Sequence, residues 1–206
     1  MELIKRCGAL IVVSAPSGAG KTTLCHEVRR LVPDLFYSVS HTTRAPRAGE
    51  VNGTDFHFVS EAEFLDLRDK DGFAEWATVH GNHYGTPVKA LEGALGRGSD
   101  VLLDIDTHGA RQLRQRYPEA VSVFVMAPSM KDLEARLRER NSDAPVEIAR
   151  RLTRAREEIA AWRQYDYLII NRDLKEAVDQ LASIIEAERC RTSRLTLRFP
   201  DVEVPE

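Results

Sequence analysis

The stretch that most constrains the fold of this chain is residues 9–23, which read Ala-Leu-Ile-Val-Val-Ser-Ala-Pro-Ser-Gly-Ala-Gly-Lys-Thr-Thr. Its first five residues are apolar and partly β-branched, a pattern typical of a buried strand in a parallel sheet covered on both faces. A loop with two glycines follows, and residues 22–31 then favour a helix. Because a strand, a glycine-bearing loop, a Lys-Thr pair and a helix occur in this order, the sequence predicts a phosphate-binding loop and a nucleoside triphosphate site.

The residue types in this loop suit the binding of phosphate. Gly18 and Gly20 allow the backbone to wrap closely round an anion, so that N–H groups and the start of the helix point at it. We expect Lys21 to reach the β- and γ-phosphates and the hydroxyl of Thr22 to bind Mg²⁺. The strict motif begins with glycine where this chain has alanine, and an ordinary glycine-rich turn is the alternative interpretation. The residues predicted to contact the triphosphate are Ala15, Pro16, Ser17, Gly18, Ala19, Gly20, Lys21 and Thr22.

Length and composition limit the class of protein. A chain of 206 residues suits one domain with a full core, and its net charge of −3 gives no reason to expect nucleic acid as a partner. The cysteines Cys7, Cys25 and Cys190 lack the spacing of metal ligands, so we interpret them as reduced thiols. No apolar run approaches the roughly 20 residues of a membrane span, and the N-terminus lacks the apolar segment of a secretory signal. We therefore expect a cytoplasmic protein without a membrane partner.

Three further apolar runs predict strands, at residues 101–106, 121–126 and 165–170, and helical segments separate them. This alternation predicts an α/β fold, a three-layer P-loop fold in which helices flank a parallel sheet. Two segments interrupt the pattern: a polar insert at about residues 37–88 and an arginine-rich helical hairpin at about residues 129–160. The predicted core is then about residues 1–36, 89–128 and 161–206, and its end after Arg191 is expected to be irregular.

Two arginines in the polar insert have a spacing that suits an anion. Arg44 and Arg47 are three residues apart, near a proline and among hydroxyl-bearing residues. Guanidinium groups arranged in this way can bind a phosphate monoester through paired hydrogen bonds. A solvent-exposed surface turn is the alternative interpretation of this segment.

A carboxylate and two hydroxyls farther along the insert suit the recognition of a nucleobase. Glu75 stands beside Trp76, and Tyr84 and Thr86 follow in a turn-rich segment. A carboxylate can accept from adjacent donors such as N1–H and N2–H of guanine, although a structural turn explains these residues equally well. Thr86 is also predicted to be the N-cap of the next helix, with Pro87 as its first residue.

The second predicted strand ends in two aspartates, Asp104 and Asp106. In proteins with a phosphate-binding loop, an acid at such a strand end helps to hold Mg²⁺, directly or through water. Capping of the following helix is the alternative role, more so for Asp106 than for Asp104. Residues 133–158 contain seven arginines, which either form solvated helix faces with glutamate partners or line a lid that closes over a triphosphate.

These motifs together closely resemble those of the guanylate kinase family, over about residues 8–189. The most specific of them, Thr-Thr-Arg-Ala-Pro-Arg-Ala-Gly-Glu, begins at Thr42. The family often has alanine at the position of Ala15, so that departure from the strict loop motif fits the resemblance. The matching segments are Ser14–Thr22, Ser38–Gly53, Gly81–Thr86 and Leu103–Asp106.

The resemblance implies a kinase that transfers the γ-phosphoryl group of ATP to GMP, with Mg²⁺ as cofactor. The catalytic residues that it implies are Lys21, Arg44, Arg136, Arg140 and Arg151. The GMP-binding residues that it implies are Ser40, Arg44, Arg47, Glu50, Glu75, Tyr84, Thr86, Asp104 and Asp106. On the ATP side it implies Asn171 near the adenine, with Thr22 and Asp104 at the Mg²⁺.

The same resemblance divides these residues by role. Arg44, Arg47 and Tyr84 are expected to hold the GMP phosphate, while Glu50 orients the loop that carries the arginines. The residues expected to read guanine are Ser40, Glu75 and Thr86, with help from Asp106. Arg136, Arg140 and Arg151 match the arginines of a lid (about residues 129–160) that closes over the transferring group, and the polar insert matches a GMP-binding subdomain.

The chain departs from the family pattern at two informative positions. Phe56 stands where the family usually has tyrosine, which removes one hydroxyl from the GMP phosphate site and predicts weaker GMP binding. Asn141 stands where the lid commonly has glycine, which predicts a stiffer hinge.

Two other functions compete with this interpretation. Guanylate-kinase-like domains also serve as non-catalytic interaction modules, but those typically lose the loop lysine, which this chain retains as Lys21. A kinase for another phosphorylated acceptor is the nearer alternative, and Glu75 with Thr86 favours guanine over it. We expect ATP and GMP as partners, no obligate protein partner, and a monomer or homodimer.

Overall fold

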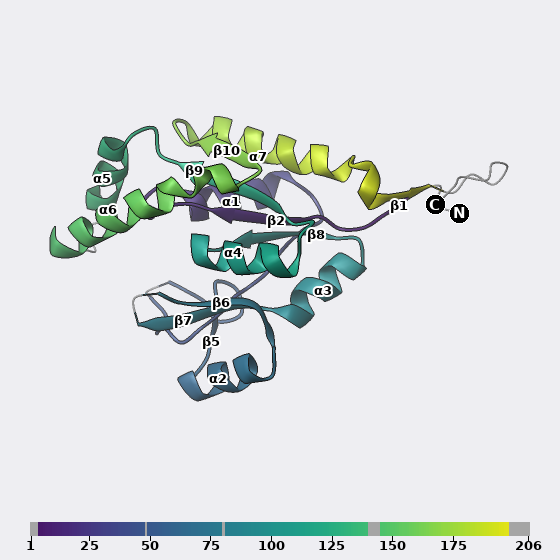
Figure 1. Cartoon of the computed structure of the whole chain (residues 1–206), viewed down its shortest axis with the longest axis horizontal. Coiled ribbons are helices and arrows are strands. Elements are labelled where there is room, and N and C mark those ends of the chain that lie inside the picture. Colours follow the sequence, from purple (N-terminus) through teal and green to yellow (C-terminus); the bar gives the residue numbers. More distant parts are fainter. Residues whose placement is uncertain (1–3, 48, 80, 140–144, 198–206) are drawn as a thin grey trace.

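A five-stranded parallel sheet forms the centre of the protein, whose computed structural model describes residues 4–47, 49–79, 81–139 and 145–197 (Figure 1). In spatial order its strands are β10 (Tyr167–Ile170), β9 (Val121–Met126), β2 (Leu10–Ser14), β8 (Asp100–Asp104) and β3 (Leu35–Tyr37). Every neighbouring pair is parallel, and all residues of the central strand β2 are buried. The predicted strands and the α/β class are confirmed. The edge strand β3 was not predicted, because its three half-buried residues form no long apolar run.

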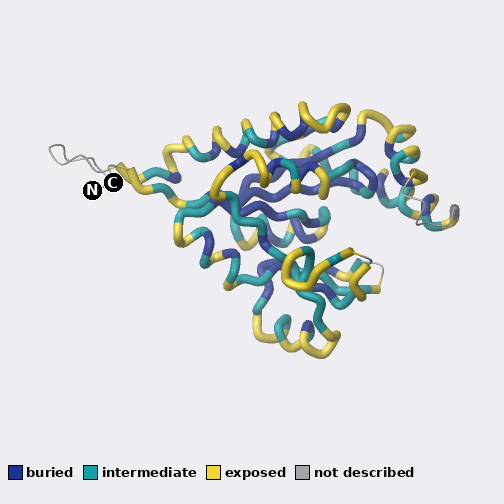
Figure 2. Tube along the Cα trace, turned by 180° about the vertical axis from the view of Figure 1, so that it is seen from behind, coloured by how far each residue is buried: buried dark blue, intermediate teal, exposed yellow. Residues whose placement is uncertain are grey.

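Helices cover both faces of this sheet (Figures 1 and 2). They are α1 (Lys21–Leu31) and α7 (Leu174–Arg189) on one face, and α3 (Val88–Gly96) and α4 (Thr107–Arg116) on the other. Alternate residues of β2 divide between two cores: Ile11 and Val13 pack with α1 and α7, whereas Leu10 and Val12 pack with α3 and α4. This double burial explains why β2 is a continuous apolar run.

A smaller sheet and helix α2 (Glu61–Asp69) make up the polar insert. In spatial order its strands are β5 (His57–Phe58), β4 (His41–Thr42), β7 (Asn82–Pro87) and β6 (Phe73–Val79). β6 and β7 pair as an antiparallel hairpin, β4 is antiparallel to β7, and β4 is parallel to β5. Figure 1 shows this sheet apart from the central sheet, on the side of α3 and α4.

The predicted helix start at Thr86 is wrong. Thr86 lies in β7 opposite Glu75, and its hydroxyl donates to the Glu75 carboxylate instead of capping a helix. Pro87 is the N-cap, with an extended backbone, and α3 begins at Val88. The cross-strand partner that holds the Thr86 side chain is distant in sequence, so the local pattern gave no sign of it.

The arginine-rich segment forms the predicted helical hairpin from α5 (Met130–Glu139) and α6 (Pro145–Ala160). Its apolar contacts are made by Leu133, Leu137, Ile148, Leu152 and Ala155. The hairpin packs closely on the loop after β2, because a Cβ atom on Gly18 would lie 3.0 Å from Cγ of Leu137. A short 3₁₀ helix, η1 (Trp162–Gln164), connects α6 to β10. Arg140 and Asn141 lie outside the described residues.

Residues 192–197 form regular elements, whereas an irregular segment was predicted after Arg191; the rest of that segment, residues 198–206, lies outside the described residues. A 3₁₀ helix, η2 (Thr192–Arg194), leads into β11 (Leu195–Leu197), which pairs antiparallel with β1 (Ile4–Arg6). These elements are too short to show a hydrophobic period, and β1 and β11 gain their backbone hydrogen bonds only by pairing across the whole chain.

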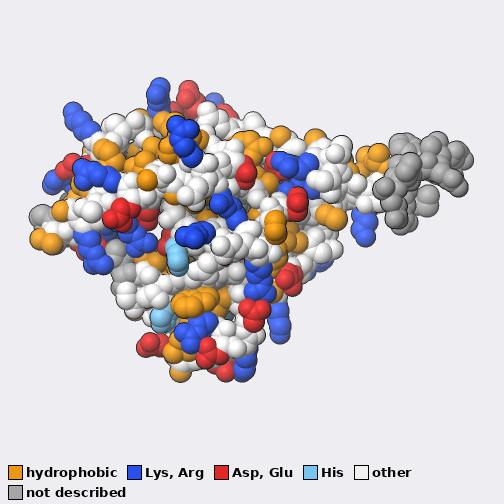
Figure 3. All heavy atoms as spheres, in the orientation of Figure 1, with side chains coloured by type: hydrophobic (Ala, Val, Ile, Leu, Met, Phe, Trp, Pro, Cys, Tyr) orange, Lys and Arg blue, Asp and Glu red, His pale blue; other side chains and the backbone are white. Residues whose placement is uncertain are grey.

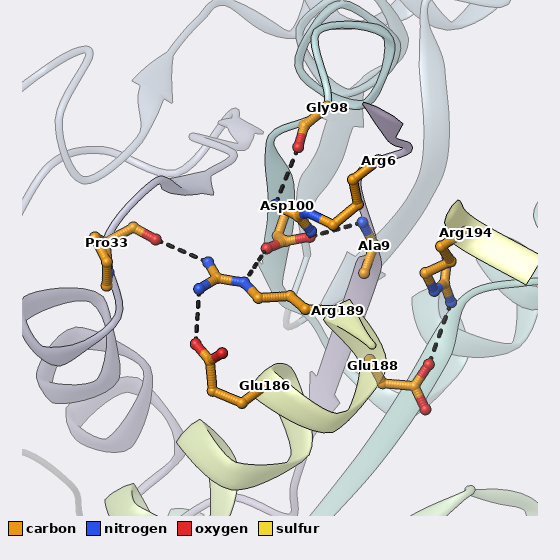
Figure 4. Close-up of polar contacts among 9 residues, drawn as sticks. All are labelled: Arg6, Ala9, Pro33, Gly98, Asp100, Glu186, Glu188, Arg189 and Arg194. Atoms are coloured by element: carbon orange, nitrogen blue, oxygen red, sulfur yellow. Dashed lines mark hydrogen bonds and ion pairs between the residues drawn. The ribbon is translucent and has the colours of Figure 1, made fainter. Parts of the chain in front are cut away.

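A buried carboxylate anchors this terminal region to the sheet (Figure 4). Asp100, at the start of β8, is 0% exposed and forms ion pairs with Arg6 and Arg189. The backbone N–H of Ala9 donates to the same carboxylate at 2.8 Å. Burial alone would raise the pKa of Asp100, but the hydrogen bonds from Arg6, Ala9 and Arg189 outweigh it, so the pKa lies below its ordinary value.

The outer surface carries charges of both signs. On the face shown in Figure 3, Lys and Arg side chains are interspersed with Asp and Glu side chains. Among the described residues, no helix is long and apolar enough to cross a membrane.

Candidate active site

The loop between β2 and α1 borders a cavity of about 320 Å³, which we call the loop cavity. Seven of the eight residues predicted to contact a triphosphate line it: Ala15, Pro16, Ser17, Gly18, Gly20, Lys21 and Thr22. Ala19 is the exception, because it is fully buried. Gly20 is the N-cap of α1 with a φ of 90°, a left-handed conformation that favours glycine. The loop cavity therefore meets the amino end of a helix, where backbone N–H groups attract anions.

Asn171 and Arg136 support this loop from outside the cavity. Nδ2 of Asn171 donates to the carbonyl of Ala19 at 2.8 Å. Arg136 donates to the same carbonyl at 3.4 Å and to the carbonyl of Asn171 at 2.9 Å. A Cβ atom on Gly20 would lie 2.5 Å from Nδ2 of Asn171, so this close packing also requires glycine. In this structure Arg136 and Asn171 fix the backbone of the loop and do not line its cavity.

Lys21 links the loop to the end of β8. Its Nζ lies 2.6 Å from Oδ1 of Asp104 and donates to the carbonyl of Ile105 at 2.7 Å. Burial alone lowers the pKa of Lys21, but the Asp104 carboxylate more than offsets this effect and the pKa is raised. The ammonium group is thus a fixed positive charge at the carboxyl edge of the central sheet.

A second cavity, of about 390 Å³, lies between the polar insert and this same edge, and we call it the insert cavity. The predicted GMP-binding residues that line it are Ser40, Arg44, Arg47, Glu50, Glu75, Tyr84, Asp104 and Asp106. Thr86 does not line it, because it is fully buried behind Glu75. The residues common to both cavities are Lys21, Thr22, Val79, Tyr84 and Asp106. Two ligands bound in these cavities would therefore meet beside Lys21 and Thr22.

Glu75 is a buried acid at the wall of the insert cavity. It is 5% exposed, and Thr86 donates to its Oε1 at 2.5 Å. Burial raises the pKa of Glu75 to about 7, although the hydrogen bond from Thr86 opposes the rise. The other oxygen faces the first turn of α4, where a Cβ atom on Gly109 would lie 2.3 Å from Oε2. Glycine at that position is what allows the carboxylate and the helix to approach so closely.

The two arginines of the insert are organised by one carboxylate. Glu50 accepts from Nη2 of Arg44 at 2.8 Å and from the backbone N–H of Arg47 at 2.7 Å. The hydrogen bond from Arg44 is the main reason that the pKa of Glu50 is lowered. The guanidinium carbon of Arg44 also lies 5.5 Å from the ring centre of Phe56, whose edge contacts Tyr84. The arrangement holds Arg44 at the cavity wall.

Asp106 caps a helix, which is one of the roles considered for it, and it also pairs with an arginine of the hairpin. Its Oδ1 accepts from the backbone N–H of Gly109 at 2.8 Å, so it is the N-cap of α4. Its Oδ2 forms an ion pair at 3.2 Å with Nη2 of Arg154, which belongs to α6 of the hairpin. Arg154 lines the loop cavity, and Glu158 holds its Nε at 3.0 Å.

Sequence reasoning assigned no role to Arg154 or to several residues of the insert cavity. Arg154 lies one helical turn beyond Arg151, which also lines the loop cavity and pairs with Glu147 at 3.5 Å. That spacing was a signal available in the sequence. The unpredicted residues with polar side chains that line the insert cavity are His26, Tyr37, Ser38 and Asp55. Tyr37 and Ser38 were missed because they are the end of β3 and the residue after it.

Thr22 and Asp104 offer oxygen donors that fit Mg²⁺. A hydroxyl and a carboxylate are hard ligands, and Mg²⁺ commonly takes only one or two protein ligands beside phosphate oxygens and water. Both residues line the insert cavity, and Thr22 also lines the loop cavity. Among the described residues, no group of three or more His, Cys, Asp or Glu side chains forms a metal site by itself.

Comparison with known proteins gives consistent matches. A family model described as guanylate kinase matches residues 8–188. The guanylate kinase of Geobacter metallireducens is 52% identical over 192 residues, covering 93% of this chain and 95% of the relative. The guanylate kinase of Geobacter sulfurreducens is 50% identical with the same coverage of both chains. The crystal structure of guanylate kinase from Anaplasma phagocytophilum has a TM-score of 0.80 and 36% identity, and covers 94% of this chain and 92% of that one.

Proposed function

The chain belongs to the guanylate kinase family, as its motifs indicate, and on this basis we propose that it transfers the γ-phosphoryl group of ATP to GMP, giving ADP and GDP. The observation that carries this proposal is the junction of the two cavities at Lys21 and Thr22. A phosphoryl transfer between two bound nucleotides needs donor and acceptor phosphates side by side. In this assignment the loop cavity holds the triphosphate of ATP and the insert cavity holds GMP.

On the donor side, the loop backbone and the amino end of α1 bind the phosphate oxygens. Lys21 supplies a fixed positive charge, and Arg151 faces the same cavity from the hairpin. Arg136 and Asn171 keep the loop in place; Asn171 would lie near the adenine, and Arg136 is proposed to act on the transferring group from the lid. Thr22 and Asp104 would hold Mg²⁺, which when bound supplies positive charge to the triphosphate.

On the acceptor side, the phosphate of GMP lies with Arg44, Arg47 and Tyr84. Glu50 holds the guanidinium of Arg44 and the backbone of Arg47, so that the Arg44 side chain needs little ordering when the phosphate arrives. The guanine lies against Glu75, which accepts from its N1–H and N2–H, with Ser40 nearby. Thr86 acts through Glu75, because its hydroxyl donates to that carboxylate and does not face the cavity.

No covalent intermediate or general base is required. Phosphoryl transfer of this kind depends mainly on positioning the two phosphates and neutralising charge. Lys21, Arg44 and Arg151 bring positive charge from three sides of the junction, and we propose that Arg140 joins them from the lid. Closure of the hairpin over the loop cavity would exclude water, which otherwise hydrolyses ATP.

The proposed division of the chain follows these roles. One guanylate-kinase-like domain spans residues 8–189, with a GMP-binding insert at about residues 37–88 and a lid at about residues 129–160. ATP and GMP belong to the nucleotide pool of the cytoplasm, which is where we place the reaction.

The test is ADP production from Mg-ATP with GMP, AMP, UMP or CMP as acceptor, each with the Lys21→Ala variant as control. Strong turnover with GMP that disappears in Lys21→Ala would support the proposal. Turnover with another acceptor would overturn the assignment of guanine to Glu75. Nucleotide binding without turnover would instead indicate an interaction module and overturn the enzymatic proposal.

A further inference from the structure

Arg154 connects the hairpin to the acceptor side of the site. It projects from α6 and lines the loop cavity, yet its Nη2 pairs with Asp106, which lines both cavities. Their side chains are 38% and 23% exposed, so the pair lies at the mouth of the site and is partly shielded from water. None of the roles proposed above for the site residues depends on the ion pair between Arg154 and Asp106.

The contact continues inward to the base-reading carboxylate. Oδ1 of Asp106 caps α4 at the N–H of Gly109, and Gly109 lies against Oε2 of Glu75. Glu75 is in turn held by Thr86 at 2.5 Å. Asp106 thus links Arg154 to the first turn of α4, which packs against Glu75.

Arg154 is oriented for this purpose and its charge is already balanced. Glu158, one turn along α6, holds Nε at 3.0 Å and leaves Nη2 directed at Asp106. The guanidinium is thus held between two carboxylates, Asp106 and Glu158. The arrangement favours a role in positioning over direct contact with ATP.

We propose that Arg154 is a positioning residue for GMP: from the ATP-side hairpin it holds Asp106, and through Asp106 the wall of the guanine site. This inference rests on the proposed function, because it takes GMP as the ligand of the insert cavity. Through this ion pair, the affinity for GMP depends on the position of the α5–α6 hairpin.

The experiment compares steady-state kinetics of Arg154→Gln and Arg154→Lys with those of the wild type, whose turnover of GMP is established first. Residues in one ion-pair network commonly couple strongly enough that Arg154→Gln should raise KM for GMP roughly fivefold. KM for ATP should change by less than about twofold, as for a site outside the network. Arg154→Lys should recover part of the loss, since it restores the charge without the planar fork.

A matched control and a double-mutant cycle separate this role from a structural one. Arg138→Gln removes an exposed arginine that pairs within α5, with Glu134 at 2.7 Å, and should leave both KM values unchanged. In an Asp106→Asn background, Arg154→Gln should raise KM for GMP by less than about twofold, because its partner is already neutral.

Each other outcome is decisive. A rise in KM for ATP with KM for GMP unchanged would make Arg154 a triphosphate contact and overturn the inference. Unchanged KM values, or additive effects in the cycle, would also overturn it. Absence of GMP turnover in the wild type would overturn the proposed function as well, and is recognised before any variant is measured.

Discussion

Replacement of Glu75 by glutamine should stabilise the empty protein at alkaline pH while abolishing its recognition of guanine. Glu75 is buried, and its pKa is raised to about 7 from an ordinary value of 4.5. The folded state therefore favours the protonated acid, whereas the unfolded chain releases the proton above about pH 4.5. The stabilisation that protonated Glu75 gives to the folded state is therefore lost as the pH rises from 4.5 through 7. Above about pH 7 the free energy of unfolding has fallen by the full amount.

The separation between about 7 and 4.5 corresponds to roughly 3 kcal/mol of unfolding free energy at pH 8, and to less than about 1 kcal/mol at pH 5. Glutamine keeps the shape and the oxygen that accepts from Thr86, but it has no charge to bury. In a chain of 206 residues, the difference of about 2.5 kcal/mol between the two pH values should raise Tm of Glu75→Gln over the wild type by roughly 5–10 °C more at pH 8 than at pH 5.

The assay is thermal unfolding of both proteins across that pH range without nucleotide. The comparison between the two proteins cancels the titration of every group that they share. A Tm difference that is the same at pH 5 and pH 8 would refute the claim that ionised Glu75 is costly in the fold. GMP binding should weaken about 100-fold or more in the same variant, because two charge-assisted hydrogen bonds are lost.

Three further substitutions test separate parts of the structure. Gly109→Ala places a Cβ atom against Oε2 of Glu75 and should raise KM for GMP at least about tenfold by displacing that carboxylate. The control is Gly93→Ala in α3, whose Cβ atom meets nothing closer than 3.5 Å and should leave KM for GMP unchanged. Phe56→Tyr adds a hydroxyl at the wall of the insert cavity and should lower KM for GMP roughly tenfold, so an unchanged KM contradicts the proposed weakness of this phosphate site. Asp100→Asn leaves two arginines without their buried partner and should cost about 3 kcal/mol of unfolding free energy at pH 7. Because the pKa of Asp100 is lowered from 3.8, this deficit should shrink only as the pH falls below about 4, which urea unfolding at several pH values can measure.

The central sheet could be predicted from the sequence because its strands are long enough to show their burial. β2 is a run of apolar residues up to Val13 whose two faces both contact helices, and β9 is apolar except for Ser122. The phosphate-binding loop was equally visible, since its residues are adjacent in sequence and each has a local reason to be there. In contrast, β3, β4 and β11 have two or three residues each, and their pairing partners lie far along the chain. Strands of that length leave no period to read.

The contacts around the candidate site residues could not be predicted from the sequence, for a different reason. The motifs named Glu75, but its raised pKa depends on burial against Gly109, which belongs to another element. The resemblance named Arg136 for the transferring group, whereas in this structure it donates to the backbone of the loop. Arg154 carried no motif at all, and its importance follows only from the nearness of Asp106. Each of these properties is a contact between elements that no local pattern records.

The meeting of the two cavities follows from the order of strands in the central sheet. β2 and β3 are the two neighbours of β8, so the loop that leaves β2 stands beside the carboxyl end of β8. The polar insert begins at the carboxyl end of β3, and the chain then returns to the sheet through α3 and β8. Because β3 is parallel to β8, the insert starts beside the carboxyl end of β8. Parallel strands place all of their carboxyl ends on one edge, where ligands of open α/β sheets bind. The loop that we assign to the triphosphate and the insert that we assign to the acceptor thereby meet beside Asp104, and Lys21, which pairs with Asp104, lines both of their cavities. The adjacency that phosphoryl transfer requires is thus a property of the topology, and the side chains that tune it could be recruited afterwards.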